Sequence, residues 1–176
     1  MRIVAALALV GIVLGVGALV VATEPTWYLR MRYPLKYEQI VRGHAQNYGL
    51  EPELLAAVIY TESKFDADAE SESGAIGLMQ LLPETAAGIA TRTGGSKFRT
   101  EDLYDPELNV RYGSWYLRHL LQKYDGDLAK ALAAYNGGQG NVDRGIQYPE
   151  TTAYVERVQE LSQVYRRAYA RELESA

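Results

Sequence analysis

Residues 51–62 read Glu-Pro-Glu-Leu-Leu-Ala-Ala-Val-Ile-Tyr-Thr-Glu, and this stretch decides how the rest of the chain is interpreted. It predicts a helix that begins at Pro52, because proline suits the first helical position. One face of this helix, at i, i+3, i+4 and i+7, consists of Leu55, Val58, Ile59 and Glu62. A carboxyl group on an apolar face tends to keep its proton, since burying its charge is costly. Glu62 is therefore a candidate general acid.

The position of Glu62 also allows a structural interpretation. It lies near the end of the expected helix, where its side chain could reach water or pair with Lys64. Carboxyl groups with perturbed pKa values also occur in purely structural networks. Periodicity alone therefore leaves both interpretations open.

The composition limits the function classes. The chain has 176 residues, of which 48% are hydrophobic and 23% charged, as in a globular domain. A formal net charge of −4 does not favour nucleic acid as a partner. The absence of cysteine excludes disulfides and thiolate sites, and His44 and His119 lack metal-ligand spacing, so we expect no metal and no cofactor. The 14 tyrosines suit either a wet cleft for polar rings or amphipathic packing.

The N-terminal segment is strongly apolar. Residues 3–22 contain no charge and are numerous enough to cross a bilayer as a helix. The sequence before residue 23 fits a signal peptide, but the length of the run and the Trp27-Tyr28 pair favour an uncleaved anchor. Residues 1–22 are accordingly expected to form a signal-anchor or signal peptide, and residues 23–35 a juxtamembrane tether. Arg30, Arg32 and Lys36 on the C-terminal flank favour a cytoplasmic domain. Arg2 weakly favours the opposite orientation, so charge does not settle it.

Helical patterns dominate the remainder of the chain. Beyond the helix at Pro52, they predict helices near residues 37–45, 83–90, 106–120, 127–135 and 151–168. Gly49 is expected to end the helix near residues 37–45, and Asp105-Pro106 to begin the helix near residues 106–120. No alternating strand pattern and no internal repeat is evident, although a short hairpin within residues 65–80 stays possible. The fold class is therefore an all-α domain over residues 36–173, preceded by the hydrophobic helix.

The segment from Ser71 to Gln80 connects two expected helices and is rich in small residues. Gly74 and Gly77 permit tight turns and close backbone approach. Met79 offers an adaptable apolar surface, and Gln80 an amide that both donates and accepts hydrogen bonds. Such a loop could hold a sugar N-acetyl group, but an ordinary glycine-rich connection explains the same pattern.

Four ordered groups of residues resemble one known family. They are Glu62-Ser63-x-Phe65 with Ala69-x-Ser71-x-x-Gly74-Ala75-x-Gly77-Leu78-Met79-Gln80 and Pro83-x-Thr85-Ala86; Leu103-x-Asp105-Pro106-x-x-Asn109-Val110-x-x-Gly113-x-x-Tyr116-Leu117; Ala133-Ala134-Tyr135-Asn136-Gly137-Gly138-x-Gly140-x-Val142; and Glu150-Thr151-x-x-Tyr154-Val155. In this order they are similar to the catalytic domain of the soluble lytic transglycosylases (the SLT family), which has a lysozyme-like fold. Two departures, Gly137 for the usual alanine and Gln139 for the usual proline, could loosen the turn after Tyr135.

The resemblance implies cleavage of the β-1,4 bond between N-acetylmuramic acid and N-acetylglucosamine in peptidoglycan. Glu62 would protonate the glycosidic oxygen and then act as base toward the C6 hydroxyl of the muramoyl sugar. The product would be a 1,6-anhydro sugar, formed without water. An intramolecular nucleophile has a high effective concentration, so no second carboxylate is needed. The acids of the following loop are expected to be solvated: Asp66, Asp68, Glu70 and Glu72.

The resemblance also implies roles for other residues. Substrate binding would involve Ser71, Met79, Gln80, Tyr135, Asn136, Glu150 and Tyr154. The first three would contact the sugars, and Tyr135 would lie close to the acid, with Asn136 supporting it. Glu150 would line the cleft with Tyr154, or else hold the fold by hydrogen bonding.

The expected partners follow from this activity. They are peptidoglycan strands and, through residues 3–22, the cytoplasmic membrane. Because peptidoglycan lies outside that membrane, the domain is expected at its outer face or exported. Two alternatives stay open: a hydrolase on the same fold, resembling goose-type lysozyme, and a non-catalytic glycan-binding domain of the envelope.

Overall fold

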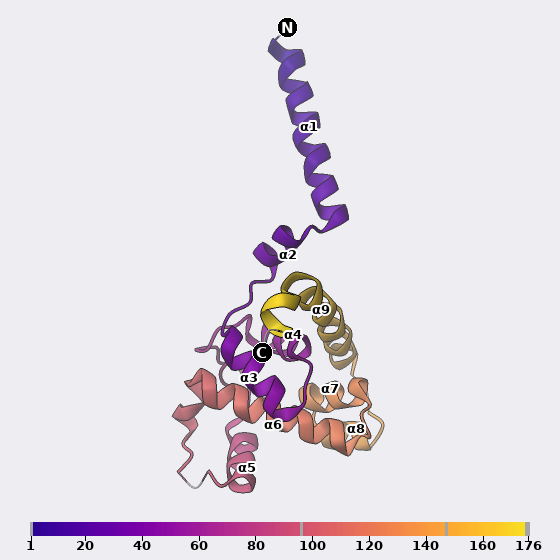
Figure 1. The fold of residues 1–176 in the computed structure, drawn as a ribbon. Coiled ribbons are helices and arrows are strands. Elements are labelled where there is room, and N and C mark those ends of the chain that lie inside the picture. Colours follow the sequence, from indigo (N-terminus) through magenta and orange to yellow (C-terminus); the bar gives the residue numbers. More distant parts are fainter. Residues whose placement is uncertain (1, 96, 147, 175–176) are drawn as a thin grey trace. The chain divides into compact units, whose positions relative to one another are not determined.

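A computed structural model of the chain describes residues 2–95, 97–146 and 148–174 (Figure 1). Two compact units are distinguished, Met1–Pro34 and Leu35–Ala176. The first contains α1 (Arg2–Thr23) and α2 (Thr26–Arg32). The second contains α3 (Glu38–Tyr48), α4 (Pro52–Ser63), α5 (Pro83–Thr93), the 3₁₀ helix η1 (Thr100–Tyr104), α6 (Pro106–Lys123), α7 (Leu128–Gly137), α8 (Gln139–Asp143) and α9 (Pro149–Glu174).

The predicted all-α class is confirmed for the described residues. They contain no sheet strand, and the possible hairpin within residues 65–80 amounts to two isolated antiparallel bridges, Glu70 with Ile76 and Ile76 with Leu81. Helices η1 and α8 were not predicted, and α2 lies within the expected tether. The prediction for residues 1–22 includes Met1, and the predicted domain over residues 36–173 includes Ser96 and Gln147. These three residues lie outside those that the structure describes.

The first unit does not confirm a transmembrane helix. Within the described residues, no single helix meets both the length and the apolarity needed to cross a bilayer. The segments Gly11–Thr23 and Thr26–Arg32 meet them only as a pair, and this pair is bent by 84°. The anchor therefore stays a proposal.

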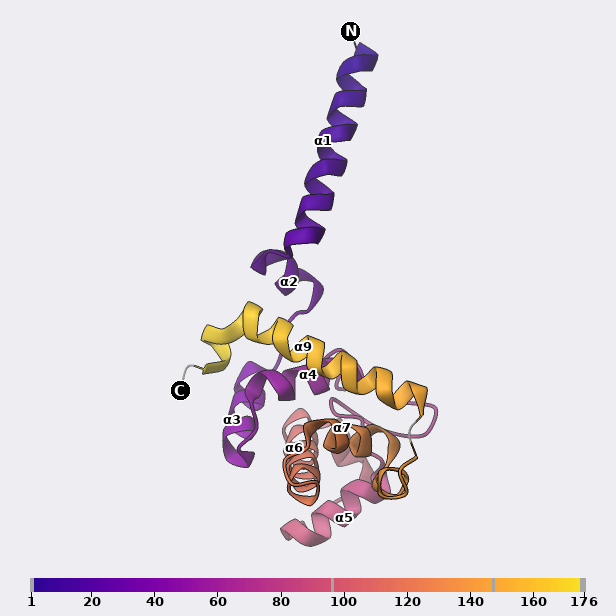
Figure 2. The same ribbon diagram turned by 90° about the vertical axis from the view of Figure 1, so that its right-hand side faces the viewer.

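Helix α4 forms the centre of the second unit. Leu54 is 6% exposed and the next five residues, through Ile59, are 0% exposed. The sequence pattern predicted one buried face, but α4 is buried on nearly all sides. The reason is packing: α9 runs along α4 (Figure 2), and α3 also contacts it. A helix surrounded in this way is apolar all round rather than amphipathic.

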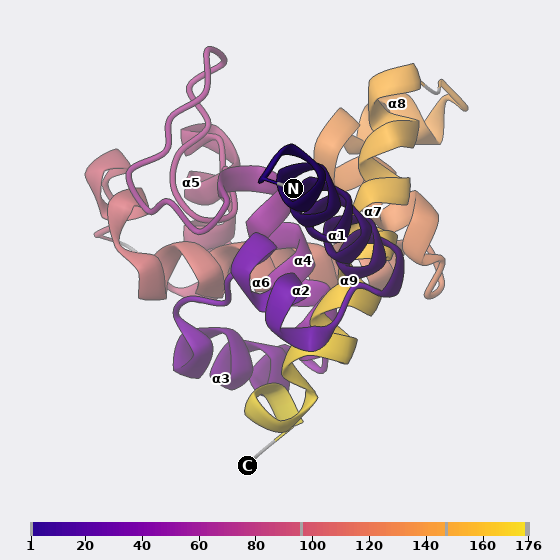
Figure 3. The ribbon, with the colours of Figure 1, turned by 90° about the horizontal axis from the view of Figure 1, so that it is seen from above.

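The segment between α4 and α5 runs beside α5 on one side of the unit (Figure 3), and α5 packs against α6. Asn109 of α6, 0% exposed, fixes this segment in place. Its Oδ1 accepts from the backbone nitrogen of Met79 at 2.8 Å, and its Nδ2 donates to the carbonyls of Ile76 and Leu103 at 2.9 and 2.8 Å. One buried amide therefore satisfies three backbone groups that would otherwise be unpaired.

Two glycines let this segment pack tightly against α6. At Gly77, where φ is +81°, a Cβ atom would lie 2.3 Å from Nδ2 of Asn109. At Gly113, a Cβ atom would lie 2.3 Å from the sulfur of Met79. Any larger residue at either position would displace the segment from α6.

We predict that Asn109→Ala lowers the free energy of unfolding by about 3–5 kcal/mol, because it leaves three buried backbone groups without partners. Urea unfolding followed by circular dichroism measures this change. Asn47→Ala, at an exposed position of α3, is the matched control and should change stability by less than about 0.5 kcal/mol. Equal effects of the two substitutions would contradict the role given to Asn109.

Candidate active site

Glu62 lies in the last turn of α4, at the point where that buried helix reaches a cleft. Its Oε1 accepts a hydrogen bond of 2.6 Å from the hydroxyl group of Tyr154 in α9. Burial raises the pKa of Glu62 to about 7, and the bond from Tyr154 opposes this rise to a smaller extent. As expected from the sequence, the pKa lies well above that of a free glutamate, so near neutral pH a large fraction of Glu62 carries a proton.

The alternative in which Glu62 pairs with Lys64 is not supported. No ion pair joins Glu62 to any residue that the structure describes, and Lys64 is the C-cap of α4, with φ at +53°. The four acids of the following loop are exposed, as predicted: Asp66, Asp68, Glu70 and Glu72. The perturbed carboxyl group of Glu62 is thus not balanced by a neighbouring cation.

The cleft beside Glu62 has a volume of about 290 Å³. It is lined by the end of α4, by the segment from Ser71 to Thr85, and by residues of α6 and α7. Glu62 is the one carboxyl group among the described residues that line it. The described residues also contain no group of three His, Cys, Asp or Glu side chains that could hold a metal ion.

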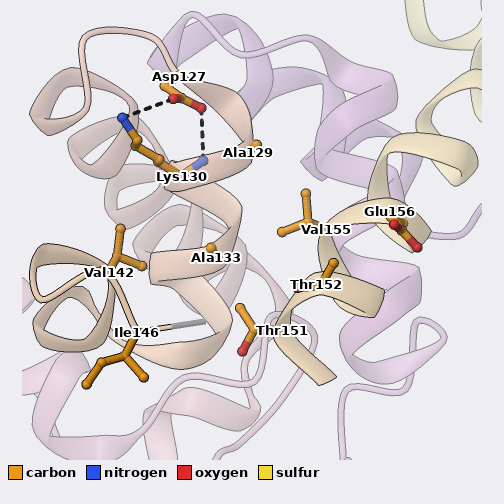
Figure 4. Close-up of a pocket in the computed structure, with 11 residues that line it drawn as sticks. Asp127, Ala129, Lys130, Ala133, Val142, Ile146, Thr151, Thr152, Val155 and Glu156 are labelled. Atoms are coloured by element: carbon orange, nitrogen blue, oxygen red, sulfur yellow. Dashed lines mark hydrogen bonds and ion pairs between the residues drawn. The ribbon is translucent and has the colours of Figure 1, made fainter. Parts of the chain in front are cut away.

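A larger cavity of about 480 Å³ lies elsewhere, between α7, the chain after α8 and the start of α9 (Figure 4). Its walls are mainly apolar, with Val142 and Ile146 facing Val155 across it. Asp127 and Lys130 pair at its edge. None of the predicted site residues lines this cavity, so the smaller cleft is the candidate active site.

Gln80 and Ser71 line the cleft, and both are held by local hydrogen bonds. Gln80 adopts a φ of +48°, and its Nε2 donates to the carbonyls of Ala69 and Gly77, each at 3.0 Å. The hydroxyl of Ser71 accepts from the backbone nitrogen of Ala75 at 3.0 Å. The loop therefore presents these two side chains in fixed positions.

Met79 differs from the sequence-based expectation. Its side chain is 0% exposed, packs on Gly113, and is not among the residues that line the cleft. The backbone carbonyl of Met79 instead accepts a hydrogen bond of 2.8 Å from the hydroxyl of Tyr135. Met79 therefore positions a cleft residue rather than offering its sulfur to a ligand.

Tyr135 and Asn136 reach the cleft from the C-terminal end of α7. The ring of Tyr135 lies 5.5 Å from that of Tyr116, measured between centroids. Burial and the nearby charge of Glu62 raise the pKa of Tyr135 well above its ordinary value. The same two causes raise the pKa of Tyr154. Both hydroxyl groups therefore stay neutral and act as hydrogen-bond donors.

Glu150 is not brought to the cleft. It is exposed in the first turn of α9 and is not among the residues that line the cleft. Tyr116 and Thr85 do line it, although neither was among the predicted site residues. Both residues lie within the motifs that resemble the SLT family. Those motifs alone do not distinguish residues that pack in the core from residues that line the cleft.

Comparisons with known proteins identify the family of this chain. The model of the Transglycosylase SLT domain matches residues 39–157. Membrane-bound lytic murein transglycosylase C of Yersinia pestis (strain Pestoides F) is 37% identical over 118 residues, which cover 62% of this chain and 33% of that protein. The protein of the same name from Yersinia pseudotuberculosis serotype O:1b gives the same values.

Solved structures show the same fold. An inactive mutant of lytic transglycosylase Slt from Pseudomonas aeruginosa aligns with a TM-score of 0.74 and 31% identity, over 80% of this chain and 25% of that one. The 70 kDa soluble lytic transglycosylase of Escherichia coli aligns with a TM-score of 0.74 and 27% identity, over 79% and 25%. The chain thus spans about a third of the length of the curated relatives it matches. Because the family model covers most of the chain and includes Glu62, the chain belongs to the Transglycosylase SLT domain family.

Proposed function

We propose that this chain is a peptidoglycan lytic transglycosylase, which cleaves the β-1,4 bond between N-acetylmuramic acid and N-acetylglucosamine. The observation that carries the proposal is Glu62, whose carboxyl group has a pKa of about 7 and lies in a cleft without a second carboxyl group among its described residues. Names of the matching relatives, which include lytic murein transglycosylase, support the same reaction.

The proposed reaction uses Glu62 twice. Its protonated form gives the proton to the glycosidic oxygen as the bond from that oxygen to C1 of the muramoyl sugar breaks. The C6 hydroxyl of the same sugar then attacks C1, and its proton returns to Glu62. The enzyme ends in its starting state and no water is consumed. Because the nucleophile belongs to the substrate, its effective concentration is high and a second carboxylate is not required.

The neighbouring residues have distinct proposed roles. Tyr154 holds Oε1 of Glu62, which leaves Oε2 without a partner among the described residues and available to the substrate. Ser71, Gln80 and Asn136 would contact the sugars, and Tyr135 would stabilise positive charge that develops at C1. Met79 would act through its backbone carbonyl, which positions Tyr135. Glu150, which does not line the cleft, would instead hold the fold by hydrogen bonding.

Location follows from the substrate. Peptidoglycan lies outside the cytoplasmic membrane, so the domain over residues 36–173 would act at the outer face of that membrane. Residues 3–22 would serve as an anchor or an export signal, with residues 23–35 as the connection. The words "membrane-bound" in the names of the relatives support this location.

We predict that Glu62→Gln lowers the rate of glycan cleavage by on the order of 10²–10⁴-fold, because the amide cannot donate the proton. Mass spectrometry of digested sacculi should show anhydro ends for the natural chain and almost none for the variant. Glu72→Gln, at an exposed position of the loop, is the control and should retain the rate. Reducing ends that contain one more water would identify a hydrolase, and unchanged lysis by Glu62→Gln would exclude Glu62 as the acid.

The pH dependence should follow the protonated form of Glu62. Activity is expected to fall as the pH rises through about 7. Since the bond from Tyr154 lowers the pKa of Glu62, Tyr154→Phe should move this fall to higher pH. The variant should also have a lower rate than the natural chain at pH values below the fall. Rate profiles of the two proteins from pH 4.5 to pH 9 provide the measurement. A fall at the same pH in both would show that Tyr154 does not act on Glu62.

The buried carboxyl group of Glu62 should lower the free energy of unfolding at pH values where it is ionised. The pKa of Glu62 rises from 4.5 to about 7 on folding, so the natural chain loses stability as the pH rises across that interval. Glu62→Gln carries no charge and avoids this loss. We expect its advantage in the free energy of unfolding to grow by about 3 kcal/mol between pH 4 and pH 8. Urea unfolding at both pH values measures the difference, and a constant difference would contradict the burial of this acid.

A further inference from the structure

Gln139 is one of the two departures from the family pattern, and it follows the turn that ends α7. The resemblance leads one to expect proline here, and its absence could loosen the turn after Tyr135. The turn is nevertheless held: α7 ends at Gly137, α8 begins at Gln139, and Nδ2 of Asn141 donates to the carbonyl of Gly137 at 2.7 Å. Proline is therefore not needed to form this turn.

The side chain of Gln139 joins α8 to two residues of α6. Its Oε1 accepts a hydrogen bond of 3.0 Å from Nζ of Lys123, and its Nε2 donates to the hydroxyl of Tyr116 at 3.3 Å. A lysine side chain has only donors, so the amide must turn its oxygen toward Lys123 and its nitrogen toward Tyr116. Lys123 therefore fixes which end of the amide faces Tyr116.

Lys123 is itself held in place by α8. Its Nζ lies 2.6 Å from Oδ2 of Asp143, and the hydroxyl of Tyr124 donates to Oδ1 of the same carboxylate at 3.0 Å. These two hydrogen bonds hold the pKa of Asp143 below its ordinary value, so the carboxylate stays charged at neutral pH. An ion pair of this kind adds little stability, but here it keeps the ammonium group of Lys123 beside Gln139.

Tyr116 connects this network to the cleft. Its hydroxyl accepts from Gln139 and makes no other hydrogen bond with a residue that the structure describes. Because a hydroxyl group both donates and accepts, its own proton remains for another partner. Tyr116 lines the cleft that contains Glu62, and its ring packs against that of Tyr135. An acceptor group of a ligand in the cleft is therefore a suitable partner for this proton.

We propose that Gln139 is a positioning residue, which makes Tyr116 a hydrogen-bond donor to the substrate. While Nε2 of Gln139 donates to the hydroxyl, the proton of Tyr116 cannot be given to Gln139 and is available to the cleft. Tyr116 thereby favours a substrate oxygen that accepts, such as an acetyl carbonyl, over a group that only donates. Proline has no side-chain amide and could not exert this control. The inference rests on the proposed function, since the ligand is taken to be a glycan strand.

Gln139→Glu reverses the polarity of this contact at almost constant shape. One carboxylate oxygen still accepts from Lys123, but the other can only accept, so the hydroxyl of Tyr116 must donate to it and is lost as a donor to the ligand. Binding of a glycan tetrasaccharide without peptides is measured on the full chain in mild detergent, with Glu62→Gln present throughout so that the glycan stays intact. We expect Gln139→Glu to raise the dissociation constant by about fivefold, the loss of one neutral hydrogen bond.

Gln139→Pro separates this polarity from a merely structural role. Proline suits the first position of a helix, where the backbone N–H has no partner within the helix. This variant leaves the hydroxyl of Tyr116 able to donate in either direction, so the dissociation constant should rise by less than about twofold. Tyr116→Phe should weaken binding as much as Gln139→Glu does, and the two substitutions together should weaken it no further, because both remove the same donor.

Gln122→Glu, at an exposed position of α6 beside Lys123, is the matched control, since it adds the same charge outside the cleft and should leave the constant unchanged. An unchanged constant for Gln139→Glu would overturn the proposal. A larger loss for Gln139→Pro than for Gln139→Glu would also overturn it, because the side chain would then only support the turn. A natural chain that binds the glycan but forms no anhydro ends would refute the proposed function and leave the role of Gln139 in binding intact.

Discussion

The hydrogen bond between Tyr154 and Glu62 is the interaction on which the site depends. It joins α9 to α4 across 92 positions of sequence, with 2.6 Å between the two oxygens. Helix α4 carries Glu62 to its place because its apolar residues are enclosed on nearly all sides, so the helix cannot rotate the carboxyl group toward solvent without exposing them. Packing of α9 along α4 therefore fixes both the burial of the acid and the donor that contacts it.

A second chain of contacts builds the rest of the cleft. Asn109 of α6 binds the backbone of Met79, and the carbonyl of Met79 accepts from Tyr135 of α7. Gly77 and Gly113 permit this arrangement, since a Cβ atom at either position would collide with Asn109 or Met79. The loop that faces Glu62 is thus held by α6 below it and itself positions a side chain of α7. Its shape comes from buried polar contacts and close packing of the described residues.

The sequence predicted the all-α class, most helices of the second unit and the buried acid, because these depend on local periodicity and on capping residues. It did not predict that Asn109 would be a buried hub, since an asparagine within a helix carries no local sign of burial. It placed the side chain of Met79 in the cleft, whereas the structure buries that side chain against Gly113. Glu150 is a second example: its motif places it at the start of α9 but does not show whether its side chain reaches the cleft. Contacts between distant segments decide these points.

The opposing influences on Glu62 suit its two proposed roles, first as acid and then as base. Burial alone would raise its pKa further, and such a group would donate its proton poorly. A stronger set of hydrogen bonds would lower the pKa, and the group would then be ionised before the substrate arrived. One hydrogen bond from a neutral tyrosine leaves the pKa near 7, where the proton can leave and return at similar cost. Since Tyr135 and Tyr154 both stay neutral, the carboxylate formed in the first step would be the one negative charge among the described residues of the cleft. Its attraction for a developing positive charge at C1 would then be undiminished by competing ions.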